Sequence, residues 1–290
     1  MAYSKETSKA LKRLQQDEIN AYYIYLKLSG MIREVDNAAV LERIANEEKK
    51  HFEVFSGYLN HSVKPSRGYV VWFVFLARIL GLTFALKLME KKEATVEVYE
   101  KAMEEIPEIR QIIDDEERHE GELLDMLDEE RLSYMGSVVL GLNDALVELT
   151  GALAGFTLSI QNSRTIAIVG LITGISASLS MAASEYLSSR TEADGEVNPK
   201  KAAIYTGIAY VFTVIMLILP FFLIANYILS LAVTLLIAIL IIAFFNYYIS
   251  VANDQPFFAR FGEMTLISLG VALVSFGIGF LVNKFFGLDI

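Results

Sequence analysis

The chain has 290 residues, of which 54% are hydrophobic, with a mean hydropathy of +0.42 and a formal net charge of −10. This hydropathy is too high for an ordinary soluble protein of this length. The chain contains no cysteine, which excludes disulfides, thiolate zinc sites and iron–sulfur clusters, so any bound metal must have oxygen and nitrogen ligands.

The charged residues divide the chain into two parts. Residues 1–130 hold 26 of the 35 acids and 18 of the 25 bases, whereas residues 131–290 hold 9 acids and 7 bases. We therefore expect an acidic domain over residues 1–132 and a membrane domain over residues 133–290. The first 27 residues contain no apolar targeting segment, so the acidic domain is expected to stay in the cytoplasm.

The first predicted helix runs from Ser4 to about Val35. Its apolar residues recur at steps of three and four, and Glu18 lies on the same stripe. A glutamate is rarely buried without a partner, so a metal ion or a hydrogen-bonded cation is expected beside Glu18.

A turn at residues 36–37 is predicted to lead into a second helix over residues 38–59. This helix carries Glu48 and His51. Folded back as an antiparallel pair, the two helices would bring Glu48 opposite Glu18.

The pattern Glu-x-x-His occurs twice, as Glu48 to His51 and as Glu116 to His119, and it includes two of the three histidines. Residues three apart share a helix face, so the carboxylate and the imidazole can hold one metal ion. Two such pairs facing each other across a bundle can hold two ions. The alternative is a surface charge pair on an acidic helix, but the two copies, each preceded by a glutamate-bearing helix, favour the metal site.

Residues 69–89 form an apolar run long enough to span a bilayer. However, Arg78 lies near its centre, where a charge costs about 3 kcal/mol, and Gly81 interrupts it. We expect a crossover along the bundle or the membrane surface, with an additional transmembrane helix as the alternative.

The third helix is predicted from about Ile79 to the break at residues 106–107. Glu93 on its apolar stripe is the first choice of ligand and Glu90 the second, and Glu97 stays open. A fourth helix over residues 108–131 carries the second Glu-x-x-His copy.

This alternation of Glu and Glu-x-x-His on four helices is an internal duplication, and it resembles the ferritin-like, rubrerythrin-type di-iron bundles over about 130 residues. The resemblance implies an iron cofactor, with manganese or zinc as alternatives, and Glu48 and Glu116 as bridging ligands. The ligands that it implies are Glu18, Glu48, His51, Glu93 with Glu90, Glu116 and His119. One departure is that no tyrosine follows a helix-three glutamate by seven residues, as Tyr25 follows Glu18.

Five apolar runs of spanning length follow. They cover residues 138–160, 165–187, 202–223, 227–249 and 264–286. Four bases fall on the second and fourth connectors (Arg190, Lys200, Lys201 and Arg260) and two fall on the other side (Arg164 and Lys284). This bias places the second and fourth connectors, and the acidic domain with them, in the cytoplasm.

Ionisable residues within the spans mark an ion or proton path, because a carboxylate in hydrocarbon is costly. Asp144 and Glu148 lie one turn apart in the first span, and Met181 and Glu185 lie in the second. Carboxylate oxygen and methionine sulfur together suit Fe(II) better than Mg(II) or Ca(II). The alternatives are that Glu185 lies in water at the end of its helix and that Met181 only fills space in the apolar core. Both spans are rich in small residues, which predicts that they form the packed centre of the membrane domain.

This half resembles the vacuolar iron transporter family, in the Gly-Leu-Asn-Asp of residues 141–144 and the Ser-Met-Ala-Ala-Ser-Glu-Tyr-Leu of residues 180–187. The resemblance implies a homodimer with the metal path at the subunit interface, and proton-coupled export of Fe(II) or Mn(II). Members with a long acidic insert between spans two and three differ from this chain, where only residues 188–201 intervene. A bundle fused ahead of such a transporter resembles the membrane-bound ferritin branch.

The sequence thus predicts an all-α protein of the cell membrane, a four-helix ferritin-like bundle followed by five transmembrane helices. The bundle would capture or sense metal, and the spans would export it in exchange for protons. Fe(II) or Mn(II), protons, the bilayer and a second copy are the expected partners, with no nucleic acid. The alternative function is a membrane-anchored peroxidase or ferroxidase.

Overall fold

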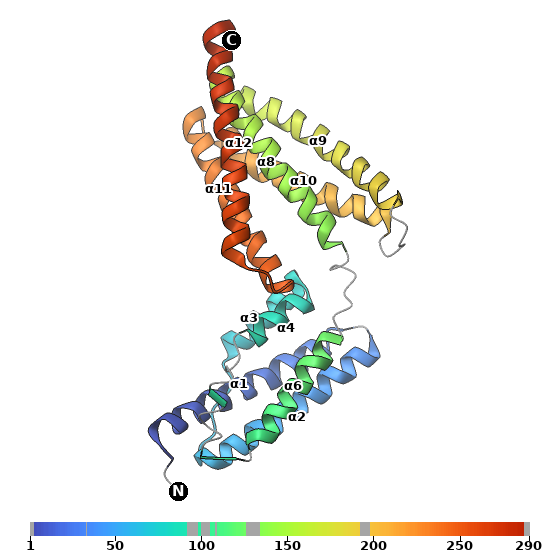
Figure 1. Cartoon of the computed structure of the whole chain (residues 1–290), viewed down its shortest axis with the longest axis vertical. Helices are drawn as coiled ribbons and strands as arrows, with labels where there is room; N and C mark the ends of the chain where they lie inside the picture. Colours follow the sequence, from blue (N-terminus) through green and yellow to red (C-terminus); the bar gives the residue numbers. More distant parts are fainter. Residues whose placement is uncertain are drawn as a thin grey trace. The chain divides into compact units, whose positions relative to one another are not determined.

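The computed structural model describes residues 3–32, 34–91, 98–99, 105–107, 109–125, 134–191 and 198–286. Within these residues every regular element is an α-helix, so the predicted all-α class is confirmed. The chain forms two compact units, Met1–Glu129 and Glu130–Ile290 (Figure 1).

The helices described in the first unit are α1 (Lys5–Ser29), α2 (Val35–Leu59), α3 (Arg67–Leu80), α4 (Leu82–Glu90) and α6 (Ile109–Asp125). Helix α1 starts at an N-cap, where the Ser4 hydroxyl accepts the Thr7 amide hydrogen at 3.0 Å. It packs along α2, and apolar side chains such as Leu11 and Ile44 are fully buried in this unit (Figure 1).

The boundary between the first two helices differs from the prediction. Helix α1 ends at Ser29, and the connection covers residues 30–34. Asp36 and Asn37, predicted as the turn, lie in the first turn of α2, where an acid is favoured by the helix dipole. The Asn37 side chain also donates to the Glu34 carboxylate at 2.7 Å.

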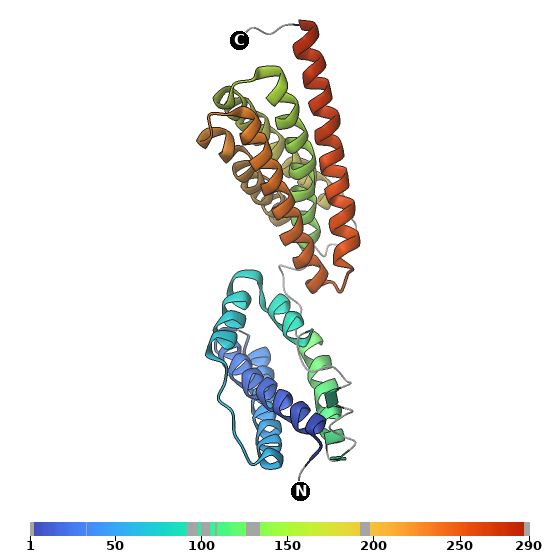
Figure 2. The ribbon, with the colours of Figure 1, turned by 90° about the vertical axis from the view of Figure 1, so that its left-hand side faces the viewer.

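The run predicted as a crossover is helix α3, with 14 residues. At 1.5 Å per residue its length is about 21 Å, too short for a hydrocarbon core of about 30 Å, so it is no transmembrane helix. Val70, Phe73 and Leu76 are buried on the side of α3 that packs in the first unit. The helix ends at Gly81, whose φ of 101° is left-handed, and the chain bends sharply there (Figure 2). The next helix therefore starts at Leu82 and not at Ile79.

Much of the predicted third helix lies outside the described residues. Glu93 and Glu97 lie outside the described residues, and only the backbone of Glu90 is described, at the end of α4. Helix α6 begins one residue after the predicted start of the fourth helix, and the predicted stretch beyond residue 125 is also outside the described part.

The second unit contains five helices long and apolar enough to cross a membrane, as predicted. They are α8 (Met135–Ile160), α9 (Ser163–Thr191), α10 (Pro199–Leu223), α11 (Tyr227–Ala252) and α12 (Phe257–Phe286). Each helix extends past the apolar run that predicted it. Polar N-caps set two of these starts: Asn198 accepts the Lys200 amide hydrogen and Asn226 accepts that of Leu229, both at 3.0 Å.

The centre of the second unit is α8 with α10, not α8 with α9 as predicted. Half of the most apolar stretch is buried in α8 and in α10, against 28% in α9. Helix α12 lies along α8, where Gly279 meets the Gly155 backbone so closely that a Cβ would clash (Figure 2). Helix α9 packs on α10 with Gly174 against Val214, but other small residues of α9 face outward: Ser176, Ser180, Ala183 and Ser184.

Candidate metal centres

The first unit brings together one glutamate of α1 and both Glu-x-x-His copies. Ligand atoms of Glu18, Glu48, His51 and Glu116 all lie within 4.8 Å of one another. Glu18, Glu48, His51 and His119 are each at most 5% exposed. The helical spacing of three residues puts the two members of each copy on the same inward face.

Each histidine turns its Nδ1 atom toward the carboxylates. His51 Nδ1 lies 3.0 Å from Glu116 Oε1, and 3.7 Å from oxygens of both Glu18 and Glu48. His119 Nδ1 lies 3.1 Å from Glu48 Oε1 and 3.9 Å from Glu116 Oε2. The two rings are stacked with centroids 5.9 Å apart. Glu48 and Glu116 thus contact both histidines, the placement that bridging ligands require.

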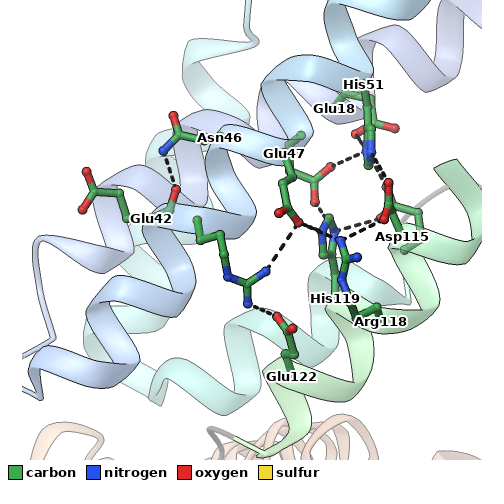
Figure 3. Close-up of polar contacts among 12 residues, drawn as sticks. Glu18, Glu42, Asn46, Glu47, His51, Asp115, Arg118, His119 and Glu122 are labelled. Carbon is green, nitrogen blue, oxygen red and sulfur yellow. Dashed lines mark hydrogen bonds and ion pairs between the residues drawn. The ribbon is translucent and has the colours of Figure 1, made fainter. Parts of the chain in front are cut away.

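The outer nitrogens of the two rings contact two acids that the sequence analysis missed. His119 Nε2 lies 2.6 Å from Glu47 Oε2, and His51 Nε2 lies 3.4 Å from Asp115 Oδ2 (Figure 3). Each of these acids directly precedes the glutamate of a copy, but it contacts the histidine of the other copy. The repeated acid before Glu-x-x-His was the available signal. Such outer carboxylates fix the tautomer and orientation of metal-binding histidines.

Arginines hold these outer acids in place. Arg118 contacts Glu47 at 2.9 Å and Asp115 at 2.8 Å, and Arg43 bridges Glu47 and Glu122 (Figure 3). Burial alone would raise the pKa of Glu47, but its hydrogen bond with His119 and the nearby arginines lower it. Glu47 therefore stays ionised as an acceptor for the imidazole N–H.

The pKa shifts within the cluster favour bound protons, which offset its negative charge. Burial, followed by the charges of Glu116 and Glu48, raises the pKa of Glu18 well above its usual value. Burial lowers the pKa of His51, but hydrogen bonds with Glu116, Glu18 and Glu48 outweigh it and raise the pKa to about 12. The pKa of His119 is also raised, mainly because Glu48 outweighs the effect of burial.

These observations fit a divalent metal pair. The buried carboxylates of Glu18 and Glu48, the partly buried one of Glu116 and two imidazoles supply hard and borderline donors that suit Fe(II), Mn(II) or Zn(II). Cations there would supply the positive charge that the metal-free site takes from protons. The glutamate predicted on the third helix is not described, so that ligand stays a prediction. Tyr99 donates to Glu18 Oε1 at 3.5 Å and is a further neighbour that the sequence analysis missed.

A cavity of about 520 Å³ adjoins this cluster. His51, Asp115 and Glu47 line it, together with the cations Lys50 and Arg118. It therefore reaches His51 on the outer side of the cluster, where Glu47 and Asp115 lie.

The second unit places its candidate residues along one face of α8. Ser137, Gly141, Asp144 and Glu148 recur at steps of four, three and four residues. From α9, Glu185 accepts the Ser137 hydroxyl at 2.5 Å, and from α10 the Tyr210 hydroxyl donates to Glu148 Oε2 at 3.1 Å.

The four predicted residues differ in their surroundings. Asp144 and Glu185 are partly buried and Glu148 is exposed in the single chain. Glu185 contacts two hydroxyl groups, since Ser189 also donates to it at 3.3 Å. Met181 is partly buried and packs against the apolar core of the unit.

Comparison with known families agrees with this division. Residues 135–197 match the VIT family. Residues 5–133 match the family of ubiquinone biosynthesis protein COQ7, a ferritin-like di-iron family. No curated protein and no solved structure matches the chain.

These matches confirm the resemblance to the vacuolar iron transporter family and, for the first half, the ferritin-like di-iron class. The match of the first half is to the COQ7 family, so the rubrerythrin type stays a prediction. The VIT match includes both motifs quoted above, residues 141–144 and 180–187. The COQ7 match includes both Glu-x-x-His copies. The protein is therefore an integral membrane protein with a VIT-like unit, which suggests metal transport, behind a COQ7-like unit, which suggests di-iron binding.

Proposed function

We propose that the protein exports Fe(II), with Mn(II) as a further cargo, from the cytoplasm across the cell membrane in exchange for protons. The observation that carries the proposal is the presence of a buried carboxylate and histidine cluster and a carboxylate-bearing VIT-like unit in one chain. The COQ7-like unit captures or senses metal, and the VIT-like unit moves it.

In the COQ7-like unit, five described side chains would hold a di-iron centre: Glu18, Glu48, His51, Glu116 and His119. Such a centre would supply reversible Fe(II) binding. Glu47 and Asp115 would keep the imidazole rings oriented both with and without metal, because they contact Nε2 of each ring and leave Nδ1 available. Glu18 and His51, whose pKa values are raised, would give up protons when metal binds.

In the VIT-like unit, the cargo path runs from Glu185 to Asp144 and Glu148. The Ser137 contact ties Glu185 to the α8 face that carries Asp144 two turns further along. Met181, one turn from Glu185 on α9, offers a sulfur ligand on this path. A carboxylate that binds a proton releases a cation, so a proton gradient can drive the cargo outward.

The homodimer that we propose accounts for two exposed features of the VIT-like unit. Glu148 is exposed in the single chain, and a carboxylate facing hydrocarbon costs about 3 kcal/mol. The outward small residues of α9 allow another helix to approach closely. A second copy that covers both faces removes the cost and places the cargo path between subunits.

The N-terminal unit is proposed to be cytoplasmic. Four bases on the second and fourth connectors, against two on the other side, support this orientation. Metal then enters from the side on which the COQ7-like unit can collect it.

The test is Fe(II) flux into proteoliposomes with an imposed proton gradient. We expect gradient-dependent flux with the wild type, loss of flux with Asp144→Asn, and normal flux with Glu263→Gln, which removes an exposed acid of α12. Flux without any dependence on the gradient contradicts the proton coupling. Absence of flux from correctly folded protein contradicts transport itself.

A membrane-anchored ferroxidase or peroxidase is the second candidate. The observation that favours it is the 520 Å³ cavity that reaches His51, which gives a small oxidant room beside the cluster. If vesicles show no flux but the protein accelerates peroxide-dependent oxidation of Fe(II), and Glu48→Gln abolishes this while Glu53→Gln does not, the enzyme replaces the exporter.

A further inference from the structure

Helix α3 is apolar on two sides but buries only one of them. The side with Phe73 is buried in the COQ7-like unit. On the other side four large apolar side chains are half or more exposed: Val71 (58%), Trp72 (50%), Phe75 (50%) and Ile79 (56%). At about 100° per residue they fall on one stripe of the helix.

Positive charge borders this exposed stripe. Arg67 and Arg78 are exposed along one edge of it. Next to its start lies a cavity of about 450 Å³ lined by Lys27, Lys64 and Arg67. Among the described residues no carboxylate lines this cavity, although residues 1–130 carry 26 acids against 18 bases.

We propose that this surface, the α3 stripe with its basic cavity, docks on a bilayer that contains anionic lipids. Trp and Phe beside Lys and Arg are the composition that partitions into the headgroup region, with apolar side chains toward the acyl chains and bases on lipid phosphates. A protein partner would need acidic groups matched to the cavity, whereas a membrane is already present because the same chain crosses it. This tethering lets a weak contact suffice.

Trp72 makes the docking measurable in the full chain, because it is the one tryptophan in the sequence. The protein is placed in nanodiscs of phosphatidylcholine and phosphatidylglycerol, with and without bromine on the acyl chains. Docking predicts a blue-shifted Trp72 emission that brominated lipid quenches and acrylamide does not reach. Emission that acrylamide quenches but brominated lipid does not would mean a face left in water and would overturn the proposal. Emission shielded from both quenchers would mean that protein covers the face, either the VIT-like unit or a second copy, and would overturn it too.

Charge reversal tests the lipid chemistry. The variant with Lys27→Glu, Lys64→Glu and Arg67→Glu should lose quenching by brominated lipid, since each base contributes about a fivefold change in the docking equilibrium. The control with Lys5→Glu, Lys9→Glu and Lys12→Glu makes the same charge change at exposed positions of α1 and should keep the quenching. Equal behaviour of the two variants would overturn the role of the basic cavity.

The apolar stripe has its own variant. Phe75→Ser changes an exposed side chain, so the fold should be retained, and the blue shift of Trp72 should shrink in the same nanodiscs. An unchanged Trp72 spectrum in folded Phe75→Ser would show that the stripe does not enter the lipid, and would overturn the proposal.

Discussion

Glu47 and Asp115 show how much of the proposed metal site lies outside its expected ligands. Each acid contacts the outer nitrogen of one histidine, and Arg118 contacts both acids. The imidazole of His119 can therefore keep one orientation whether its inner nitrogen faces a proton or a metal ion.

We expect Glu47→Gln with Asp115→Asn to weaken binding of Fe(II) or Zn(II) by about 10-fold to 100-fold, because the histidines lose their orienting acceptors. Calorimetric titration of the metal-free full chain measures the change. Glu53→Gln, an exposed acid on α2, is the control and should bind as the wild type does. Unchanged affinity in the double variant would mean that the outer acids do not orient the rings.

The stability of the metal-free COQ7-like unit should fall as pH rises above about 6.5. A histidine has an unfolded pKa of about 6.5, and that of His51 is raised to about 12 in the folded protein, so its contribution is complete below 6.5 and lost as pH rises toward 12. The raised pKa of Glu18 acts in the same direction from a lower pH. Trp72 lies in this unit, so its emission during thermal unfolding, at pH 6.5 and at pH 8.5, measures the effect.

Metal binding should remove this dependence, because bound cations replace the protons. The thermal stability of three samples is therefore compared at the two pH values: chelated wild type, metal-loaded wild type and chelated His51→Gln. The stability of chelated His51→Gln should change less with pH than that of the chelated wild type. An equal change of stability with pH in all three samples would mean that the cluster is not the site that binds these protons.

At this scale the sequence predicts which face a residue occupies but not its partner. Glu18 was found because it interrupts an apolar stripe, and burial confirms its place. Glu47 was missed because an acid next to the buried face resembles a solvated charge until the arginines of two helices close over it. Glu93 and Glu97 lie outside the described residues and only the backbone of Glu90 is described, so the choice of ligand among the three stays a prediction.

At the scale of elements, backbone contact between glycines holds the VIT-like unit together. Gly279 of α12 meets the backbone of Gly155 on α8, and no side chain fits between them. Close approach of this kind is a main source of helix association in lipid.

Gly279→Ala should therefore destabilise the VIT-like unit by about 1–3 kcal/mol, because the added methyl group separates α12 from α8. Gly277→Ala on the same helix is the matched control, since a Cβ there meets nothing within 4 Å. Unfolding in mixed micelles with increasing dodecyl sulfate measures both. Equal midpoints for the two variants would contradict the tight contact.

Hydrophobic periodicity predicts long helices well and short connections poorly. The five spans were found because about 20 apolar residues have few alternatives to crossing a membrane. Residues 69–89 could be read as a crossover or as a transmembrane helix, because apolar residues lie on two faces of α3. The end of α3 at Gly81 could not be predicted from periodicity, because it depends on a left-handed backbone conformation. Small residues misplaced the centre of the unit, since several of those in α9 face outward, although Gly170 still meets Leu153 of α8.

At the scale of the whole molecule, the absence of cysteine permits a direct test of orientation. Single cysteines replacing exposed Glu53, Thr191 or Asn253 should react with an impermeant maleimide from one side of the membrane. Those replacing Gln161 or Ala225 should react from the other side. Labelling of the Glu53→Cys variant together with the Gln161→Cys variant would contradict a cytoplasmic N-terminal unit.

The two units should also separate in transport kinetics. Replacing both Glu48 and His51 with alanine should raise the Fe(II) concentration needed for half-maximal flux but leave the maximal rate unchanged, because capture is impaired and the path is intact. Glu53→Ala is the control. Loss of the maximal rate in the double variant, with its fold preserved, would mean that the COQ7-like unit gates the path and does not merely supply it.

The crossed contacts of the histidine pair also bear on how metal leaves. Glu47 of α2 orients His119 of α6, and Asp115 of α6 orients His51 of α2, so neither repeat is a finished half-site alone. Both contacts therefore depend on the same packing of α2 against α6. A small separation of α2 from α6 would loosen both contacts at once, so in the function that we propose both metal ions would be released together.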